Sequence, residues 1–98
     1  MVKKFKDFIN ADVSADGFKL YARDAYETGK NINLIFMSRT GWFKTPKPIH
    51  IDELCELYKD LCPDMEAHHP GVVDKIFHPA IVTKLGYPVD ADGMVHWQ

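Results

Sequence analysis

Residues 51–61 read IDELCELYKDL, and this stretch carries the strongest secondary-structure signal in the chain. Its apolar residues recur every three or four positions, which places them on one face of an α-helix. Asp52 is a suitable N-cap, and Pro63 ends the helix because proline restricts the residue before it. The apolar stripe consists of Ile51, Leu54, Leu57, Tyr58 and Leu61. The pattern therefore predicts an amphipathic helix that packs against the core.

The segment before this helix is rich in residues that favour β-strands. Residues 31–38 predict one strand, residues 39–41 a turn, and residues 42–45 a return strand that ends at Pro46. Residues 49–51 are expected to add one more short strand. This part of the chain therefore predicts a β-hairpin or a three-stranded antiparallel sheet.

The N-terminal third leaves two interpretations open. Residues 3–10 predict a short amphipathic helix from their apolar spacing. For residues 14–28 we expect a second helix that ends near Gly29, because four apolar residues share one helical face: Phe18, Tyr21, Ala22 and Ala25. The alternative is a β-hairpin, since Asp16-Gly17 is a turn dipeptide and the residues after it alternate as a strand would.

The C-terminal third predicts a helix over residues 70–85 that Gly86 stops. Pro79 lies inside it and removes a backbone hydrogen bond, so we expect either a kink or two short helices. A turn at residues 90–93 follows. Together these elements predict an α+β fold in which a small β-hairpin or three-stranded antiparallel sheet packs against three to four short helices, as a single compact domain spanning residues 1–98.

The composition is that of a globular protein. The chain has 98 residues, 46% of them hydrophobic and 27% charged, which is too apolar for a disordered chain and too short for two independent cores. It has no run of about 20 apolar residues that would span a bilayer and no secretory signal, so no membrane contact is expected. Its two cysteines are too few for a disulfide framework. We therefore expect a cytoplasmic protein.

The charge is divided between the two halves of the chain. Residues 1–49 hold nine Lys/Arg and five Asp/Glu, a balance of +4, whereas residues 50–98 hold three and nine, a balance of −6. Such a division can steer a partner or favour self-association into a homo-oligomer. The alternative is that both signs mix on the folded surface and cancel.

Histidines and cysteines in the second half raise the question of a metal site. Cys55 and Cys62 are seven residues apart, about 10.5 Å along a helix, which is too far for a shared zinc ion or a disulfide. A site formed by Cys62 with His68, His69 and His78 is retained as an alternative, although the spacing matches no common ligand pattern. We therefore expect no metal and no cofactor.

Catalytic motifs are absent from the sequence. Residues 12–17 resemble the first half of an EF-hand loop, but the twelfth position is Arg23, where the ion requires a glutamate. The six glycines are scattered and form no phosphate-binding loop, and neither cysteine lies in a nucleophile signature. We therefore expect no enzymatic activity.

One segment has the composition of a binding surface. It is RTGWFKTPK, residues 39–47, in which two adjacent aromatic residues lie between cations. On a strand, only one of Trp42 and Phe43 can face the core, although both rings could instead be covered by helices on opposite faces of the sheet. An exposed ring between cations can anchor a protein partner or stack on a nucleic-acid base. The candidate partner-binding residues are Arg39, Trp42, Phe43, Lys44 and Lys47.

These observations favour a non-enzymatic binding or regulatory module, an inhibitor or adaptor that docks on a protein through this basic-aromatic hairpin. This general profile is typical of small accessory proteins of bacteria and phages. Nucleic-acid binding through the same hairpin is the second hypothesis, and the net charge of −2 disfavours it. A metal-binding protein that uses the His and Cys residues of the second half is the third.

Overall fold

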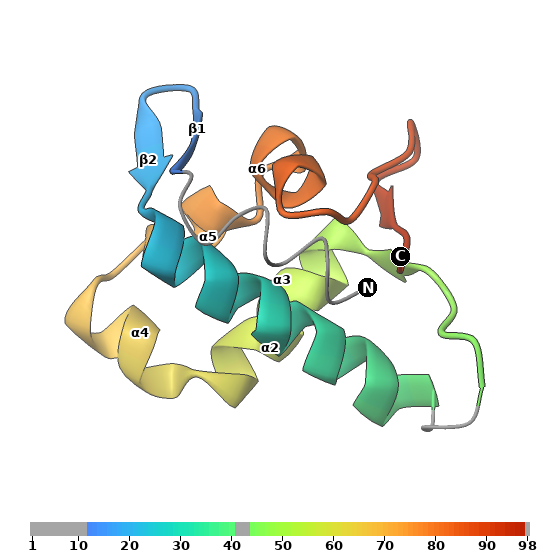
Figure 1. Cartoon of the computed structure of the whole chain (residues 1–98). Helices are drawn as coiled ribbons and strands as arrows, with labels where there is room; N and C mark the ends of the chain where they lie inside the picture. The colour runs from blue at the N-terminus through green and yellow to red at the C-terminus, as the bar shows by residue number, and fades with distance from the viewer. Residues whose placement is uncertain (1–11, 41–43, 98) are drawn as a thin grey trace.

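The computed structural model describes residues 12–40 and 44–97. In Figure 1 the long helix α2 lies across the front of the molecule, and α3 lies behind it. Within the described residues, five helices and two small two-stranded antiparallel sheets make up the fold. The elements are β1 (Val13–Ala15), β2 (Phe18–Leu20), α2 (Ala22–Thr40), β3 (Ile49–His50), α3 (Ile51–Leu61), α4 (Pro63–His68), α5 (Val72–Ile76), α6 (Pro79–Lys84) and β4 (Met94–Val95). The predicted α+β class is confirmed.

The strand predicted at residues 31–38 is wrong, because this segment is the second half of α2. The buried side of α2 has helical spacing throughout: Ala25, Thr28, Gly29, Ile32, Ile35 and Phe36. Leu34 is 43% exposed, although Ile32 and Phe36, two positions before and after it, are fully buried. On a strand these three side chains would share one face, whereas on a helix Leu34 points away from the other two. A short apolar run does not distinguish a strand from a buried helix, and here the longer pattern decides.

The helix predicted over residues 14–28 is wrong in its first half, where the β-hairpin alternative is confirmed. β1 pairs with β2 in the register Val13↔Leu20. The turn between them is Asp16-Gly17, and both residues have positive φ angles of 53° and 81°. These values suit a tight hairpin turn, which Asp-Gly favours. Gly29 therefore does not end a helix but lies inside α2, where its carbonyl oxygen accepts a hydrogen bond from the buried Tyr87 hydroxyl at 3.1 Å.

The helix predicted from residues 51–61 is confirmed as α3. Its N-cap differs from the prediction, because His50 rather than Asp52 occupies that position. The His50 Nδ1 atom accepts a hydrogen bond from the Asp52 backbone N–H at 3.1 Å. Pro63 ends α3 as predicted and also begins α4, since proline suits the first turn of a helix.

The predicted break at Pro79 is confirmed. α5 ends at Ile76, and α6 begins at Pro79 with His78 as its N-cap. The His78 Nδ1 atom accepts a hydrogen bond from the Ala80 backbone N–H at 3.1 Å. Of the two predicted outcomes, two short helices are observed and not one kinked helix. Gly86, with a φ angle of 105°, follows the end of α6 as predicted.

The second sheet joins the middle of the chain to its C-terminal part. β3 pairs with β4 in the register Ile49↔Val95, so the short strand predicted at residues 49–51 exists but pairs with residues 94–95. The predicted turn at residues 90–93 leads into β4, and the Asp90 carboxylate accepts hydrogen bonds from the Asp92 and Met94 backbone N–H groups. The single predicted sheet is thus replaced by two separate sheets.

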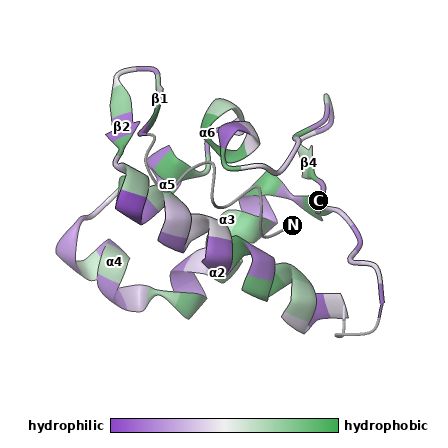
Figure 2. Ribbon diagram, in the orientation of Figure 1, coloured by the Kyte–Doolittle hydropathy of each residue, from purple (hydrophilic) through white to green (hydrophobic). Residues whose placement is uncertain are grey.

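Apolar side chains from α2, α3, α5, α6 and β4 form one core. The Phe36 ring stacks on that of Tyr87 with centroids 5.9 Å apart, and the Tyr58 ring contacts Phe77 at 5.1 Å. Figure 2 shows hydrophobic and hydrophilic bands alternating along α2, as expected for a helix with one face in the core. None of the helices in the described ranges is long and apolar enough to cross a membrane.

Candidate functional site

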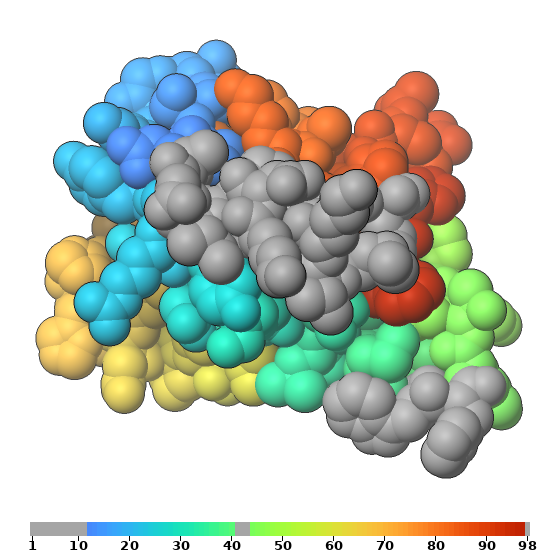
Figure 3. Space-filling view, viewed as in Figure 1, coloured from blue at the N-terminus to red at the C-terminus, as the bar shows by residue number. Residues whose placement is uncertain are grey.

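All three predicted partner-binding cations lie around one hollow of about 320 Å³ at the C-terminal end of α2. Figure 3 shows this end of the helix and the segment leading to β3 at the lower right. We call this hollow the basic hollow and define it by the residues that line it: Arg39, Thr40, Lys44, Thr45, Lys47, Pro48 and Ile49. The end of α2 and the segment that leads to β3 therefore supply its cations.

The local sequence explains why these side chains reach solvent. Arg39 lies in the last turn of α2, one turn beyond the buried Ile35 and Phe36, and its long side chain extends past the core to solvent. After the helix the chain runs through Pro46 and Pro48, which hold the residues before them extended. Pro46 and Ile49 are buried and anchor the segment, whereas Lys44 and Lys47 are exposed.

The electrostatic balance of the basic hollow is positive. Arg39 Nη1 donates a hydrogen bond to Glu53 Oε2 at 2.6 Å, and this ion pair links the end of α2 to the first turn of α3. Neither Lys44 nor Lys47 has an ion-pair partner within residues 12–40 and 44–97. Three positive side chains are therefore offset by one carboxylate.

The predicted basic-aromatic hairpin does not exist in this form, because its first strand is part of α2. Arg39 is a helical residue, and Lys44 and Lys47 belong to the segment between α2 and β3. Trp42 and Phe43 lie outside the described residues. Sequence reasoning missed Glu53, because no local signal indicated a contact between this residue and Arg39.

The four residues of the metal-site alternative lie in different surroundings. Cys62 Sγ accepts a hydrogen bond from Asn31 Nδ2 at 3.6 Å, and His68 and His69 line a hollow of about 430 Å³ between α2, α4 and α5. His78 lies elsewhere, beside the β1–β2 turn, with its Nε2 atom 2.6 Å from Asp16 Oδ2. In the part of the chain that the structure describes, no three His, Cys, Asp or Glu side chains are grouped to hold a metal ion.

His78 connects two elements through its two ring nitrogens. Nδ1 accepts the hydrogen bond from the Ala80 N–H, and Nε2, on the other side of the ring, faces the Asp16 carboxylate. Together with Lys19 and Lys75, this pair lines a hollow of about 270 Å³ beneath the hairpin turn. This arrangement gives His78 a structural role in holding the β1–β2 turn against α6.

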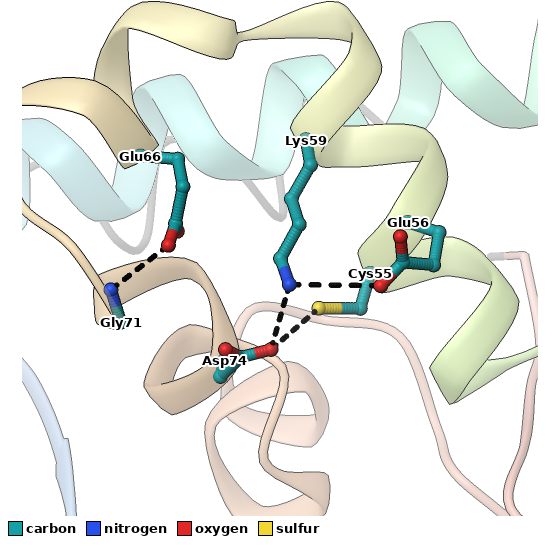
Figure 4. Close-up of polar contacts among 6 residues, drawn as sticks. All are labelled: Cys55, Glu56, Lys59, Glu66, Gly71 and Asp74. Atoms are coloured by element: carbon teal, nitrogen blue, oxygen red, sulfur yellow. Dashed lines mark hydrogen bonds and ion pairs between the residues drawn. The ribbon is translucent and has the colours of Figure 1, made fainter.

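Cys55 belongs to a polar cluster between α3 and α5 (Figure 4). Its thiol donates a hydrogen bond to Asp74 Oδ1 at 3.5 Å, and the same oxygen is 3.1 Å from Lys59 Nζ. Burial and the hydrogen bond to Asp74 raise the pKa of the Cys55 thiol to about 11, while Lys59 and the thiol lower the pKa of the Asp74 carboxyl. Cys55 is therefore a protonated structural thiol at neutral pH and is poorly suited to act as a nucleophile.

Comparisons with protein-family models, with curated proteins and with solved structures each find no match to this chain.

Proposed function

We propose that this chain is a non-enzymatic binding module of the cytosol, an inhibitor or adaptor, that docks on an acidic patch of a protein partner through the basic hollow. The observation that carries the proposal is the grouping of Arg39, Lys44 and Lys47 around one hollow with Glu53 as their only ion-paired carboxylate among the described residues. Cations held this way recognise carboxylates and speed the encounter with an acidic surface. Trp42 and Phe43 remain a prediction from the sequence.

The surroundings of the basic hollow favour a protein over a nucleic acid. α3 begins close by, and its outer face carries four exposed acidic residues: Asp52, Glu53, Glu56 and Asp60. A phosphate backbone that passes through the hollow would continue along this negative face, whereas nucleic-acid binding needs an extended basic stripe. A compact cluster of carboxylates on a protein avoids this repulsion.

Charge reversal of Lys44 and Lys47, which have no ion-pair partner among the residues that the structure describes, tests the proposal. We expect the double variant Lys44→Glu/Lys47→Glu to weaken binding of the protein captured from lysate by the immobilised wild-type chain by about 10- to 100-fold, because like charges then face each other across the interface. The captured protein is identified, purified and titrated against each variant at fixed salt concentration.

The matched control is Lys30→Glu/Lys75→Glu, which exchanges two exposed lysines outside the basic hollow. Both double variants lower the net charge by four, from −2 to −6. The long-range repulsion between the chain and an acidic partner therefore increases by a similar amount in both. We expect the control to bind within about threefold of wild type, because exposed charges that lie outside an interface are screened by salt and contribute little to its affinity. Unchanged binding by the Lys44/Lys47 variant, or an equal loss in both variants, contradicts the proposal.

A further inference from the structure

We propose that Glu53 is a resident competitor in the basic hollow, a carboxylate that an acidic partner displaces from Arg39 when it binds. The inference rests on the proposed function and adds a regulatory contact to it. Glu53 presents to Arg39 the same chemical group that an acidic protein surface would offer. The ion pair therefore sets how much of the cationic charge is available to a partner.

The geometry of the pair supports exchange. Arg39 Nη1 and Glu53 Oε2 are 2.6 Å apart, and their side chains are 47% and 49% exposed. A guanidinium carries five donors in a planar fork and can accept a second carboxylate as the first departs. Because both side chains are half-exposed, an incoming carboxylate can reach Arg39 without opening the core.

The position of Glu53 gives its carboxylate a favourable place after release. It lies in the first turn of α3, where the unpaired backbone N–H groups favour negative charge. An exposed ion pair of this kind changes an equilibrium constant by only about two- to fivefold. Glu53 therefore lowers the affinity of the basic hollow for an acidic ligand moderately and does not prevent binding.

The opposite role for Glu53 would be to orient Arg39 for the partner. If Glu53 competes, removing its carboxylate raises the affinity for an acidic ligand, and if Glu53 orients Arg39, removing it lowers that affinity. The charges around the basic hollow decide between them. Removing the Glu53 carboxylate raises the local balance from +2 to +3 and frees the Arg39 donors. An acidic ligand gains from both changes, so loss of the carboxylate tightens binding.

The test measures the affinity of a fluorescein-labelled deca-glutamate peptide by fluorescence anisotropy at low ionic strength, where attraction between exposed charges is least screened. We expect Glu53→Gln to tighten binding about two- to fivefold relative to wild type. In the Arg39→Gln background the same substitution should give a smaller gain, because the competition is for Arg39. Thermal unfolding of each variant confirms that it is folded.

Glu56→Gln is the matched control, since it removes one charge from the same helix at a residue that pairs with Lys59 instead. We expect it to change the affinity for the peptide by less than about 1.5-fold. Unchanged or weaker binding by Glu53→Gln, or an equal gain in Glu56→Gln, overturns the inference.

The Lys44→Glu/Lys47→Glu variant separates this inference from the proposed function. If this variant loses the peptide while Glu53→Gln fails to tighten it, only the role of Glu53 is wrong. If wild type and the double variant do not differ in their binding of the peptide, the basic hollow is not the binding site, and both statements fail.

Discussion

Replacing Phe36 with alanine should lower the free energy of unfolding by about 3–5 kcal/mol, the typical cost of removing a buried phenylalanine ring. Phe36 is fully buried in α2, and its ring stacks on Tyr87, which is itself 2% exposed. Since domains of this size are stable by only about 5–15 kcal/mol, this loss should leave the variant close to unfolding. Urea denaturation followed by circular dichroism measures the difference.

Leu34→Ala is the control for this prediction and separates a helix from a strand. Residues two positions apart share a face on a strand and lie on nearly opposite sides of a helix. Because Leu34 is 43% exposed, we expect its truncation to cost less than about 1 kcal/mol. Large losses of similar size for both variants would contradict the helical assignment of residues 31–38.

Gly93→Ala should destabilise the protein by about 2–4 kcal/mol, through a strained backbone and a collision that disturbs a helix cap. Gly93 has a φ angle of 82°, and a Cβ atom there would lie 2.8 Å from His50 Nε2. The His50 ring cannot easily move aside, because its Nδ1 atom caps α3 through Asp52. Chemical denaturation of the variant and of wild type gives the change.

Gly71→Ala isolates the contribution of the collision. Gly71 has nearly the same φ angle, 84°, but a Cβ atom there would meet nothing within 4 Å. We expect this variant to lose only the cost of a left-handed residue, about 1–2 kcal/mol. If the two substitutions cost the same, the contact between Gly93 and His50 does not matter for stability.

The parts of the fold that local signals determine could be predicted from the sequence. The stripe over residues 51–61 and the break at Pro79 each depend on residues close together in the chain. The secondary structure of residues 31–38 could not be predicted from their β-favouring side chains, because tertiary packing overrides the intrinsic strand propensity of single residues. The signal that could have revealed α2 is the helical spacing that continues from Ala25 through Gly29 to Phe36. The prediction missed it because it placed the end of a helix at Gly29.

The candidate site shows the same division between local and long-range information. Arg39, Lys44 and Lys47 are close in the sequence, so their proximity in space could be predicted even though the hairpin prediction is wrong. The pairing of Arg39 with Glu53 could not, because it depends on how the end of α2 packs beside the start of α3. The His50 and His78 caps are local, since each accepts from a backbone N–H two residues further on, but histidine is not among the residues that favour the N-cap position and the sequence therefore did not indicate them.

Docking through the basic hollow is tested most directly by mapping the binding surface with two-dimensional ¹H–¹⁵N NMR of the labelled chain as the identified partner is added. We predict that the largest chemical-shift changes cluster at the basic hollow, on the amides of Arg39, Thr40, Lys44, Thr45, Lys47 and Ile49. Changes centred instead on the β1–β2 turn or on α4, with the amides of the basic hollow unaffected, would contradict docking through the basic hollow.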